Sequence, residues 1–154
     1  MQHLILVRHG EYNHTSGELT NLGASDTRKL ANRLRVYVAN RRVRVLHSPL
    51  QRTKHTALII TQELGLDKSQ ENDWLRPRGE CLVPDQKVAL LELVTGLENS
   101  CDVAIFCTHA PITNLFPTVW GMSIDRQIDP RIVSNACACV INIQTREVTI
   151  IRPN

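Results

Sequence analysis

Short apolar runs and longer segments with apolar residues at helical spacing alternate along the chain. The short runs are typical of buried strands. We expect strands at residues 3–7, 43–47, 102–107, 136–143 and 148–151. The longer segments are typical of helices, which we expect over about 20–37, 48–64 and 84–97 and from residue 111 onward.

Several residues mark where the predicted helices begin and end. Thr20 is expected to cap the first helix, and Ser48 followed by Pro49 is typical of a helix start, with the serine as the cap. Gly65 should end that second helix, because glycine tolerates the left-handed backbone of a helix end. Residues 66–83 predict irregular structure, since proline and glycine interrupt them.

The order of these elements predicts the fold class. Helices between successive strands favour parallel pairing, because a parallel crossover needs a connecting segment of this length. The last two strands are separated only by residues 144–146, which predicts a hairpin and an antiparallel edge. We therefore expect one α/β domain over residues 1–154, a three-layer α/β/α sandwich with a mainly parallel central sheet.

The composition excludes several classes of protein. Hydrophobic residues make up 42% and charged residues 21%, which is near the average for globular proteins, so disorder is not expected. The apolar run that ends before Arg8 is too short for a secretion signal or a membrane span. The five cysteines form no CxxC pair, which favours reduced thiols in a cytoplasmic protein over disulfides or a structural metal site.

Positive charge is concentrated in the first third of the chain. Residues 1–55 contain ten Lys or Arg and three Asp or Glu, although the net charge of the whole chain is only +3. Such an excess favours either a surface that attracts anions or a solvated helix face. Nucleic acid is not an expected partner, because aromatic residues are few and no nucleic-acid-binding motif is present.

Three of the predicted strands are followed by residues that can bind an anion. Arg8 and His9 follow the first strand, Arg52 lies one turn into the helix after the second, and His109 follows the third. The carboxyl ends of parallel strands meet at one edge of a sheet, where ligands bind in such folds. Arginine pairs with phosphate oxygens, and histidine can attack or share a proton near pH 7. Gly10 would let the backbone approach a ligand closely.

Each of these residues alone has an ordinary explanation. An Arg-His pair at a strand end is most often a solvated turn, and a histidine before a helix, such as His109, is most often a cap. Their joint occurrence after three strands favours a phosphate site. The helix starts at Pro49 and Pro111 would add backbone amides and the positive ends of helix dipoles.

The same residues resemble the motifs of the histidine phosphatase, or phosphoglycerate mutase-like, superfamily. The family's RHG signature corresponds to residues 8–10, and the later motifs occur in the family's order. The matching segments are Arg8–Glu11, Leu19–Gly23, Ser48–Arg52, Thr56–Ala57 and Thr108–His109. The short chain, the His109-x-Pro111 motif and residues 75–80 are most similar to the small phosphohistidine phosphatases of the SixA type.

The resemblance implies a role for each matching residue. His9 would be the nucleophile that receives the phosphoryl group, and Arg8 and Arg52 would hold the phosphoryl oxygens. His109, in its protonated form, would donate a further hydrogen bond. Catalysis of this kind would need neither a metal ion nor a cofactor.

The sequence leaves the proton donor open. Many members of the superfamily carry a carboxylate in the loop after the second helix, and the candidates here are Glu80, Asp73, Glu11 or none of them. Glu80 is the first choice, whereas Glu11 would, with Gly10, belong to the substrate-binding loop. Ser48 is expected to cap its helix rather than contact substrate. The lack of a clear acid favours a phosphoramidate substrate, whose leaving imidazole can carry its own proton.

These observations predict a cytoplasmic, metal-independent phosphatase that forms a phosphohistidine on His9. The expected substrate is phosphohistidine on a partner protein. One alternative is a phosphatase of small phosphorylated metabolites or a phosphoglycerate mutase-like enzyme. Another is a module that binds phosphate or a phosphoprotein without turnover. The sequence determines neither the partner nor the oligomeric state.

Overall fold

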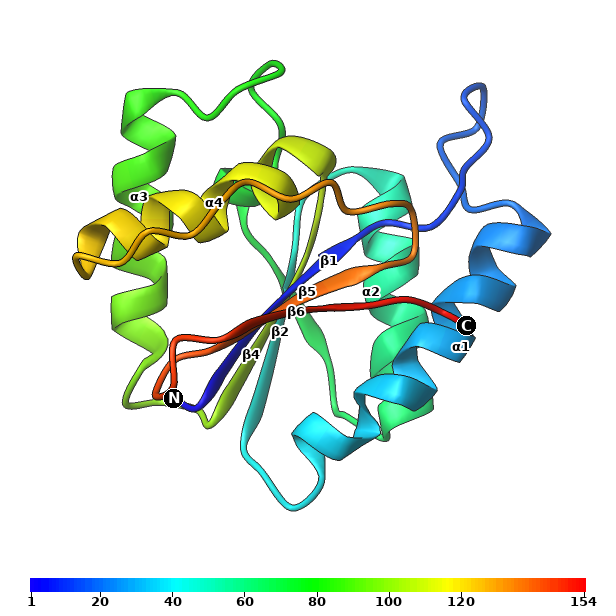
Figure 1. Cartoon of the computed structure of the whole chain (residues 1–154). Coiled ribbons are helices and arrows are strands. Elements are labelled where there is room, and N and C mark those ends of the chain that lie inside the picture. The colour runs from blue at the N-terminus through cyan, green and yellow to red at the C-terminus, as the bar shows by residue number, and fades with distance from the viewer.

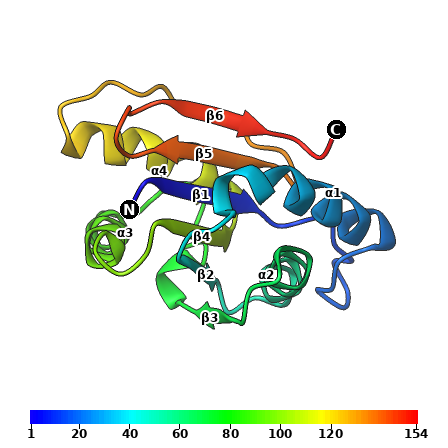
Figure 2. The same ribbon diagram turned by 90° about the horizontal axis from the view of Figure 1, so that it is seen from below.

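The computed structural model describes residues 1–154 and contains one six-stranded sheet. Its strands stand in the order β3-β2-β4-β1-β5-β6, which can be followed from bottom to top in Figure 2. The strands are β1 His3–Arg8, β2 Val43–His47, β3 Ser69–Glu71, β4 Val103–Thr108, β5 Ala138–Asn142 and β6 Val148–Ile151.

Most of the sheet is parallel, as the alternation of strands and helices predicted. β1 and β2 both pair in parallel with the central β4, and the short β3 pairs in parallel with β2. β5 runs antiparallel to β1 and to β6, so the predicted antiparallel edge is confirmed. Arg8 at the end of β1 lies beside Thr108 at the end of β4. The residues that follow β1, β2 and β4 therefore leave the sheet at the same edge.

Four helices cover the two faces of the sheet. α1 and α2 lie on one face and α3 and α4 on the other, which gives three layers (Figure 1, Figure 2). The helices are α1 Asn21–Val38, α2 Gln51–Leu64, α3 Pro84–Leu97 and α4 Ala110–Ser123. The α/β sandwich expected from the sequence is thus confirmed. None of these helices combines the length and the apolar character that a membrane span requires.

Successive residues of the strands face opposite layers of helices. In β1, Leu4 and Leu6 belong to the core formed with α3 and α4, whereas Ile5 and Val7 belong to the core formed with α1 and α2. All four side chains are fully buried. A parallel strand covered on both faces is apolar at nearly every position, which explains the uninterrupted apolar run from which β1 was predicted.

The first helix begins as predicted, and the second does not. The Thr20 hydroxyl accepts a hydrogen bond from Gly23 N at 3.0 Å and so caps α1. The first residue of α2 is Gln51, and no side chain caps this helix. The expected cap at Ser48 is therefore wrong, because that hydroxyl is bound to other side chains in the interior. Gly65 ends α2 with a φ of 66°, as expected.

Residues 66–83 are more ordered than the sequence predicted. They include β3 and the 3₁₀ turn Asp73–Leu75. β3 has only three residues, all polar, so the hydrophobic pattern could not reveal it. The side-chain amide of Gln86, buried in α3, donates to the carbonyls of Trp74 and Arg76 at 2.8 Å each. This pair of hydrogen bonds holds the segment against α3.

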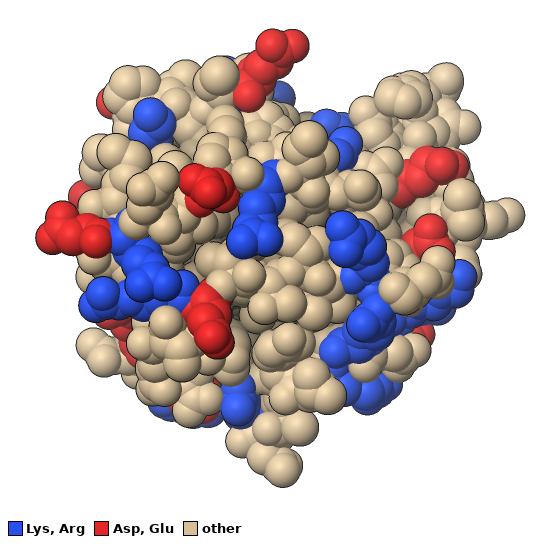
Figure 3. Space-filling view, viewed as in Figure 1, with Lys and Arg blue, Asp and Glu red and all other residues tan.

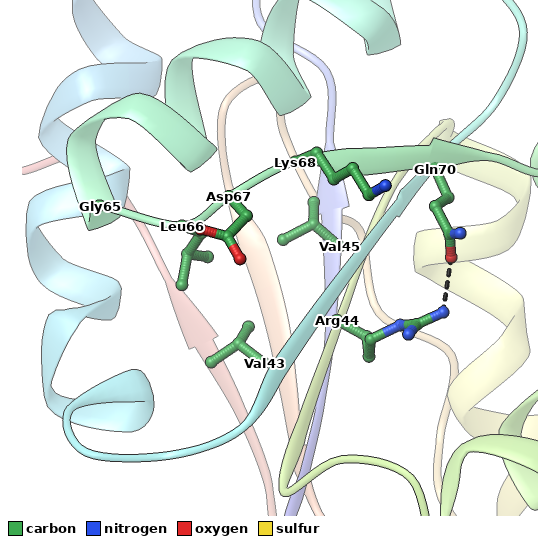
Figure 4. A pocket seen from close by; sticks show the side chains of 8 residues that line it. All are labelled: Val43, Arg44, Val45, Gly65, Leu66, Asp67, Lys68 and Gln70. Carbon is green, nitrogen blue, oxygen red and sulfur yellow. Dashed lines mark hydrogen bonds between the residues drawn. The ribbon is translucent and has the colours of Figure 1, made fainter.

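A cavity lies at the β3 edge of the sheet (Figure 4). It exists because β3 pairs with β2 only from Val45 onward, so Val43 and Arg44 have no strand beside them on this side. Arg44 reaches across it and donates to Gln70 at 2.6 Å. The cavity is lined by the amino-terminal half of β2 and not by His47 at its carboxyl end. It is therefore separate from the strand ends where the motifs lie.

The basic residues of the first third lie largely on the surface. Those of α1 are on its exposed side: Arg28, Lys29, Arg33 and Arg35. Figure 3 shows Lys and Arg gathered on the side of the molecule that α1 forms, at the right of the view. Arg42, in the turn after α1, forms an ion pair with Asp102 at 3.1 Å. This distribution is that of a solvated helix face with local ion pairs.

Candidate active site

The carboxyl ends of β1, β2 and β4 bring together the side chains that the motifs indicated. His9 follows β1 directly, Arg52 lies in the first turn of α2, and His109 immediately precedes α4. The centres of the two imidazole rings are 5.2 Å apart, and Arg52 Nε lies 3.2 Å from His9 Nε2. The molecular surface is hollowed at the upper end of the molecule in Figure 3, between two projecting loops, and Lys or Arg atoms lie in that hollow.

The hydrogen bonds of His9 define which ring nitrogen is unprotonated. Its Nδ1 lies 2.8 Å from the Gly10 carbonyl oxygen, which can only accept, so Nδ1 carries the proton. Nε2 carries the lone pair and accepts a hydrogen bond from Arg52 Nε. Burial, with a smaller contribution from the charges of Arg52 and Arg8, lowers the pKa of His9 to about 4. His9 is thus neutral at pH 7, the state that a nucleophilic imidazole requires.

Arg8 and Arg52 supply the positive charge of the site. Arg8 donates from Nη1 to the carbonyl of Val133 at 2.9 Å, and its Nε is buried without a partner. The Arg52 guanidinium lies over the ring of Tyr12, 4.6 Å from the ring centre. Each guanidinium is held by contacts within the protein and retains N–H donors for an anion.

The surroundings of His109 favour a neutral ring, whereas the family resemblance led us to expect a protonated one. His109 is 3% exposed, and its Nε2 lies 2.8 Å from the Ser48 hydroxyl. Its Nδ1 is buried and has no hydrogen-bond partner. Burial first, and then the neighbouring His9, Arg52 and Arg8, lower the pKa of His109 to about 3. The positive charge that attracts an anion disfavours a further proton on this ring.

Gly10 is required by its packing against α1 rather than by an unusual backbone conformation. A Cβ at Gly10 would lie 2.7 Å from the carbonyl oxygen of Gly23 and 2.9 Å from the Thr27 hydroxyl. Gly23 in turn faces Glu11, whose amide nitrogen would lie 2.8 Å from a Cβ at Gly23. The Gly10 amide donates to the Thr56 hydroxyl at 3.2 Å. The two glycines therefore let the loop after β1 lie directly on α1.

None of the three candidate acids is hydrogen-bonded to Arg8, His9, Arg52 or His109. Glu80 is exposed on the loop before α3, where it lines a cavity together with Ala110 and Pro111 of the first turn of α4. Asp73 forms an ion pair with Arg78 at 2.7 Å. Glu11 accepts a hydrogen bond at 2.9 Å from the hydroxyl that caps α1 and so orients its own loop. The choice of Glu80 as general acid finds no support in these contacts.

Two residues of the cluster were not predicted from the sequence. Tyr12 lies edge-on to His9, with ring centres 5.1 Å apart, and beneath Arg52. An aromatic residue inside the loop of the RHG motif was an available signal for it. Ser48 contacts His109, which lies 61 positions further along the chain. No local pattern indicates that contact, because only the pairing of β2 with β4 brings the two residues together.

This combination of side chains is suited to a phosphoryl group. Two guanidiniums match the oxygens of such an anion, and a neutral imidazole with a free Nε2 can attack its phosphorus. α4 begins at Ala110, directly after His109, so its free amides and the positive end of its dipole lie at the same edge of the sheet. The fold and the site together give an α/β protein whose sheet edge is suited to binding a phosphoryl group beside a neutral histidine.

Comparison with known families agrees with this description. The model of the histidine phosphatase superfamily (branch 1) matches residues 4–79, the part of the chain that holds His9 and Arg52. The resemblance inferred from the motifs is confirmed over this part of the chain, which is similar to the histidine phosphatase superfamily. No curated protein matches the sequence.

Solved structures with this fold cover nearly the whole chain. The protein histidine phosphatase SixA complexed with tungstate has 20% identity and a TM-score of 0.70, covering 98% of this chain and 97% of that chain. A mycobacterial glucosyl-3-phosphoglycerate phosphatase complexed with VO3 has 15% identity and a TM-score of 0.68, covering 99% and 97%. Mycobacterial hydrolase 1 has 15% identity and a TM-score of 0.67, covering 97% and 96%. These likenesses confirm the expected phosphoglycerate mutase-like fold.

Proposed function

We propose that this protein is a metal-independent phosphatase that transfers the phosphoryl group of its substrate to His9 and then to water. The observation that carries the proposal is the free Nε2 of a neutral His9, 3.2 Å from Arg52 Nε and beside the ring of His109. A phosphoryl group that takes the place of the contact to Arg52 meets the nucleophile on one side. The guanidinium donors then surround its oxygens.

The reaction has two steps. In the first, His9 Nε2 forms a bond to phosphorus as the bond to the leaving group breaks, while the proton on Nδ1 stays hydrogen-bonded to the Gly10 carbonyl. Arg8 and Arg52 stabilise the charge on the phosphoryl oxygens in the transition state. In the second step water attacks phosphorus, the bond to Nε2 breaks, and inorganic phosphate leaves. The guanidiniums supply the positive charge that a metal ion provides in other phosphoryl-transfer enzymes.

The preferred substrate in this proposal is phosphohistidine on a partner protein. The sequence motifs identify no clear general acid, which favours a leaving group that brings its own proton. The imidazole released from phosphohistidine can carry that proton, whereas an alkoxide needs a donor. The likeness in fold to SixA, described as a protein histidine phosphatase, supports the same substrate.

A phosphatase of small phosphorylated metabolites is the second candidate. The fold is about as similar to a glucosyl-3-phosphoglycerate phosphatase, with a TM-score of 0.68, as to SixA. The ratio of kcat/KM for the two kinds of substrate separates the candidates. We expect kcat/KM for a phosphohistidine peptide to be about tenfold or more higher than kcat/KM for a sugar phosphate or phosphoglycerate. Comparable values would favour the metabolite, and return of the phosphoryl group to phosphoglycerate would indicate a mutase.

Trapping of the phosphoenzyme tests the nucleophile directly. The protein is mixed with a labelled phosphoryl donor, quenched in alkali to preserve phosphohistidine, and the labelled residue is mapped. We expect the label on His9. His9→Ala should abolish the label and lower turnover by roughly 10³-fold or more, because the nucleophile is lost.

His47 provides a matched control for this experiment. It is a buried histidine at the end of β2, and its Nδ1 lies 2.8 Å from the Ser48 carbonyl oxygen, as that of His9 does from Gly10. His47→Ala should retain the label. Label on His47, on a cysteine or on a carboxylate would contradict the mechanism. A protein that binds phosphate but shows neither label nor turnover would instead be a binding module.

A further inference from the structure

The Ser48 hydroxyl is the centre of a small buried network of hydrogen bonds. Ser48 is fully buried, and its Oγ lies 2.8 Å from His109 Nε2 and 2.7 Å from Thr53 Oγ1. Leu50 N also donates to this oxygen, at 3.3 Å. Thr53 is likewise fully buried, in the first turn of α2. The network therefore links the start of α2 to His109 before α4.

The hydroxyl protons of this network have only one satisfactory arrangement. Thr53 Oγ1 lies 2.7 Å from the Leu50 carbonyl oxygen and 3.0 Å from that of Ser48, so its single proton goes to a carbonyl. The Ser48 proton then goes to Thr53 Oγ1, which has a free lone pair. Ser48 Oγ is left as an acceptor for His109 Nε2, and Nε2 must carry the proton.

The opposite arrangement would leave a close contact without a proton. If Ser48 donated to His109 Nε2, Thr53 would have to donate to Ser48 Oγ. Its oxygen would then lie 2.7 Å from the Leu50 carbonyl oxygen with no hydrogen between them. Two acceptors at that distance repel each other. The geometry therefore selects the Nε2–H tautomer of His109.

This tautomer leaves a bare lone pair on His109 Nδ1. That atom is buried and has no partner in the protein. The titratable and charged groups that face His109 are His9 and Arg8 from the end of β1 and Arg52 from α2. A buried acceptor beside two guanidiniums is unusual, because buried polar atoms are nearly always hydrogen-bonded. A ligand that carries a proton can satisfy this acceptor.

We propose that Ser48 and Thr53 are positioning residues that hold His109 as the Nε2–H tautomer, so that Nδ1 accepts a proton from the bound phosphoryl group. The inference rests on the proposed function for the identity of the ligand, but not for the tautomer. An arriving phosphoryl monoanion carries one P–O–H, which hydrogen-bonds to Nδ1. If the proton crosses, Nδ1–H donates to the same oxygen, and the total charge of the pair is unchanged. A dianion would place an oxygen lone pair against that of Nδ1.

The tautomer can be read directly from the ligand-free protein. The nitrogen chemical shifts of a ¹⁵N-labelled imidazole distinguish the protonated nitrogen from the bare one. We expect His109 of the wild type to show Nε2–H. Thr53→Val keeps the side-chain shape but removes the acceptor, so the Ser48 proton turns to His109 Nε2 and the ring becomes Nδ1–H. Thr53→Ser keeps the hydroxyl and should keep the wild-type tautomer.

Each outcome of this measurement is decisive. Nδ1–H in the wild type overturns the proposal, whether or not the variants fold. An unchanged tautomer in a folded Thr53→Val overturns the role of Thr53. A change of the His109 tautomer in Thr53→Val that does not occur in Thr53→Ser supports the role of Thr53. The tautomer measurements need no enzymatic activity, so their outcome is independent of the proposed phosphatase function.

The pH dependence of phosphate binding tests the role of the lone pair. Inorganic phosphate is titrated into the wild type and into Thr53→Val on both sides of its second pKa. We expect the wild type to bind the monoanion at least about tenfold more tightly than the dianion, because only the monoanion can donate to Nδ1. Thr53→Val, with Nδ1–H, should accept the dianion and lose most of this difference. Equal affinity of the wild type for both forms would overturn the inference, whereas absence of any phosphate binding would count against the proposed function.

Discussion

Tyr12 contacts both Arg52 and His9. Its ring lies beneath the Arg52 guanidinium, 4.6 Å from it, and edge-on to His9. A cation–π contact of this kind contributes about 0.5–1 kcal/mol at an exposed site. We expect Tyr12→Leu to lower kcat/KM roughly two- to fivefold, because Arg52 loses its support. Tyr12→Phe keeps the ring and should lose less. Steady-state kinetics with a phosphohistidine peptide compare the two, and equal losses would assign the effect to the phenol hydroxyl instead.

The protonation of single residues was the least predictable property at this scale. The motifs indicated that Arg8, His9, Arg52 and His109 would meet, and the structure brings them together. They could not indicate that His109 would be almost completely buried, with one nitrogen bound to Ser48. Burial and the nearby guanidiniums decide its charge, and both depend on segments far away in the chain.

At the scale of elements, the contact between the loop after β1 and α1 depends on Gly23. A Cβ at this position would collide with the backbone of Glu11, which cannot move without displacing the loop after β1. We expect Gly23→Ala to lower the free energy of unfolding by about 1–3 kcal/mol. Gly96, exposed in α3 with open space around it, is the matched control. Gly96→Ala should raise stability by about 0.5–1 kcal/mol, because alanine favours the helix.

Urea denaturation measures both glycine variants. A Gly23→Ala protein as stable as the wild type would mean that the loop can leave α1 at little cost. Activity of the same variant then reports whether the loop has moved, since His9 and Gly10 precede the contact directly.

A second contact between elements holds the segment after β3. Gln86 on α3 donates to the carbonyls of Trp74 and Arg76 and is fully buried. We expect Gln86→Leu to lower the free energy of unfolding by about 1–3 kcal/mol, because two buried carbonyls lose their partner. The exposed Lys87 is the control, and Lys87→Gln should have little effect. Limited proteolysis should cut the segment faster only in Gln86→Leu; equal rates would show that other contacts hold it.

At the scale of the whole molecule, the buried histidines make folding sensitive to acid. The pKa is lowered by burial to about 4 in His9 and about 3 in His109, against about 6.5 in an unfolded chain. At a pH between the folded and the unfolded pKa of each ring, the unfolded chain binds a proton that the folded protein does not. The free energy of unfolding therefore falls as the pH drops below about 6.5. Between pH 7 and pH 5, we expect the free energy of unfolding of His109→Asn to fall by on the order of 1–2 kcal/mol less than that of the wild type.

Urea denaturation of the variants at the two pH values measures this change in slope. His14→Asn, at an exposed position on the loop after β1, is the control and should keep the wild-type slope. Equal slopes in His109→Asn and the wild type would show that this ring does not titrate with folding. Saturating phosphate should oppose the loss of stability at acid pH, because it binds only the folded protein.

The sequence predicted elements well where each residue's neighbours along the chain decide its conformation. α1 begins at the cap Thr20 provides, and Gly65 ends α2, because both signals act within one helical turn. The predicted start of α2 was wrong because the Ser48 hydroxyl bonds to the side chains of Thr53 and His109 instead of to a backbone amide of the first turn of α2. β3 was missed because three polar residues become a strand only when β2 lies beside them.

By itself, the sequence determined an α/β sandwich that carries motifs of the histidine phosphatase superfamily, with two arginines and two histidines placed after its parallel strands. Those properties follow from apolar periodicity and from motifs, both of which are local. Only the tertiary structure decided that the pKa of both imidazoles is lowered, that Nδ1 of His9 carries its proton, and that no candidate carboxylate is bonded to either ring. Charge and tautomer depend on burial and on hydrogen bonds between distant segments, and these exist only once the sheet has formed.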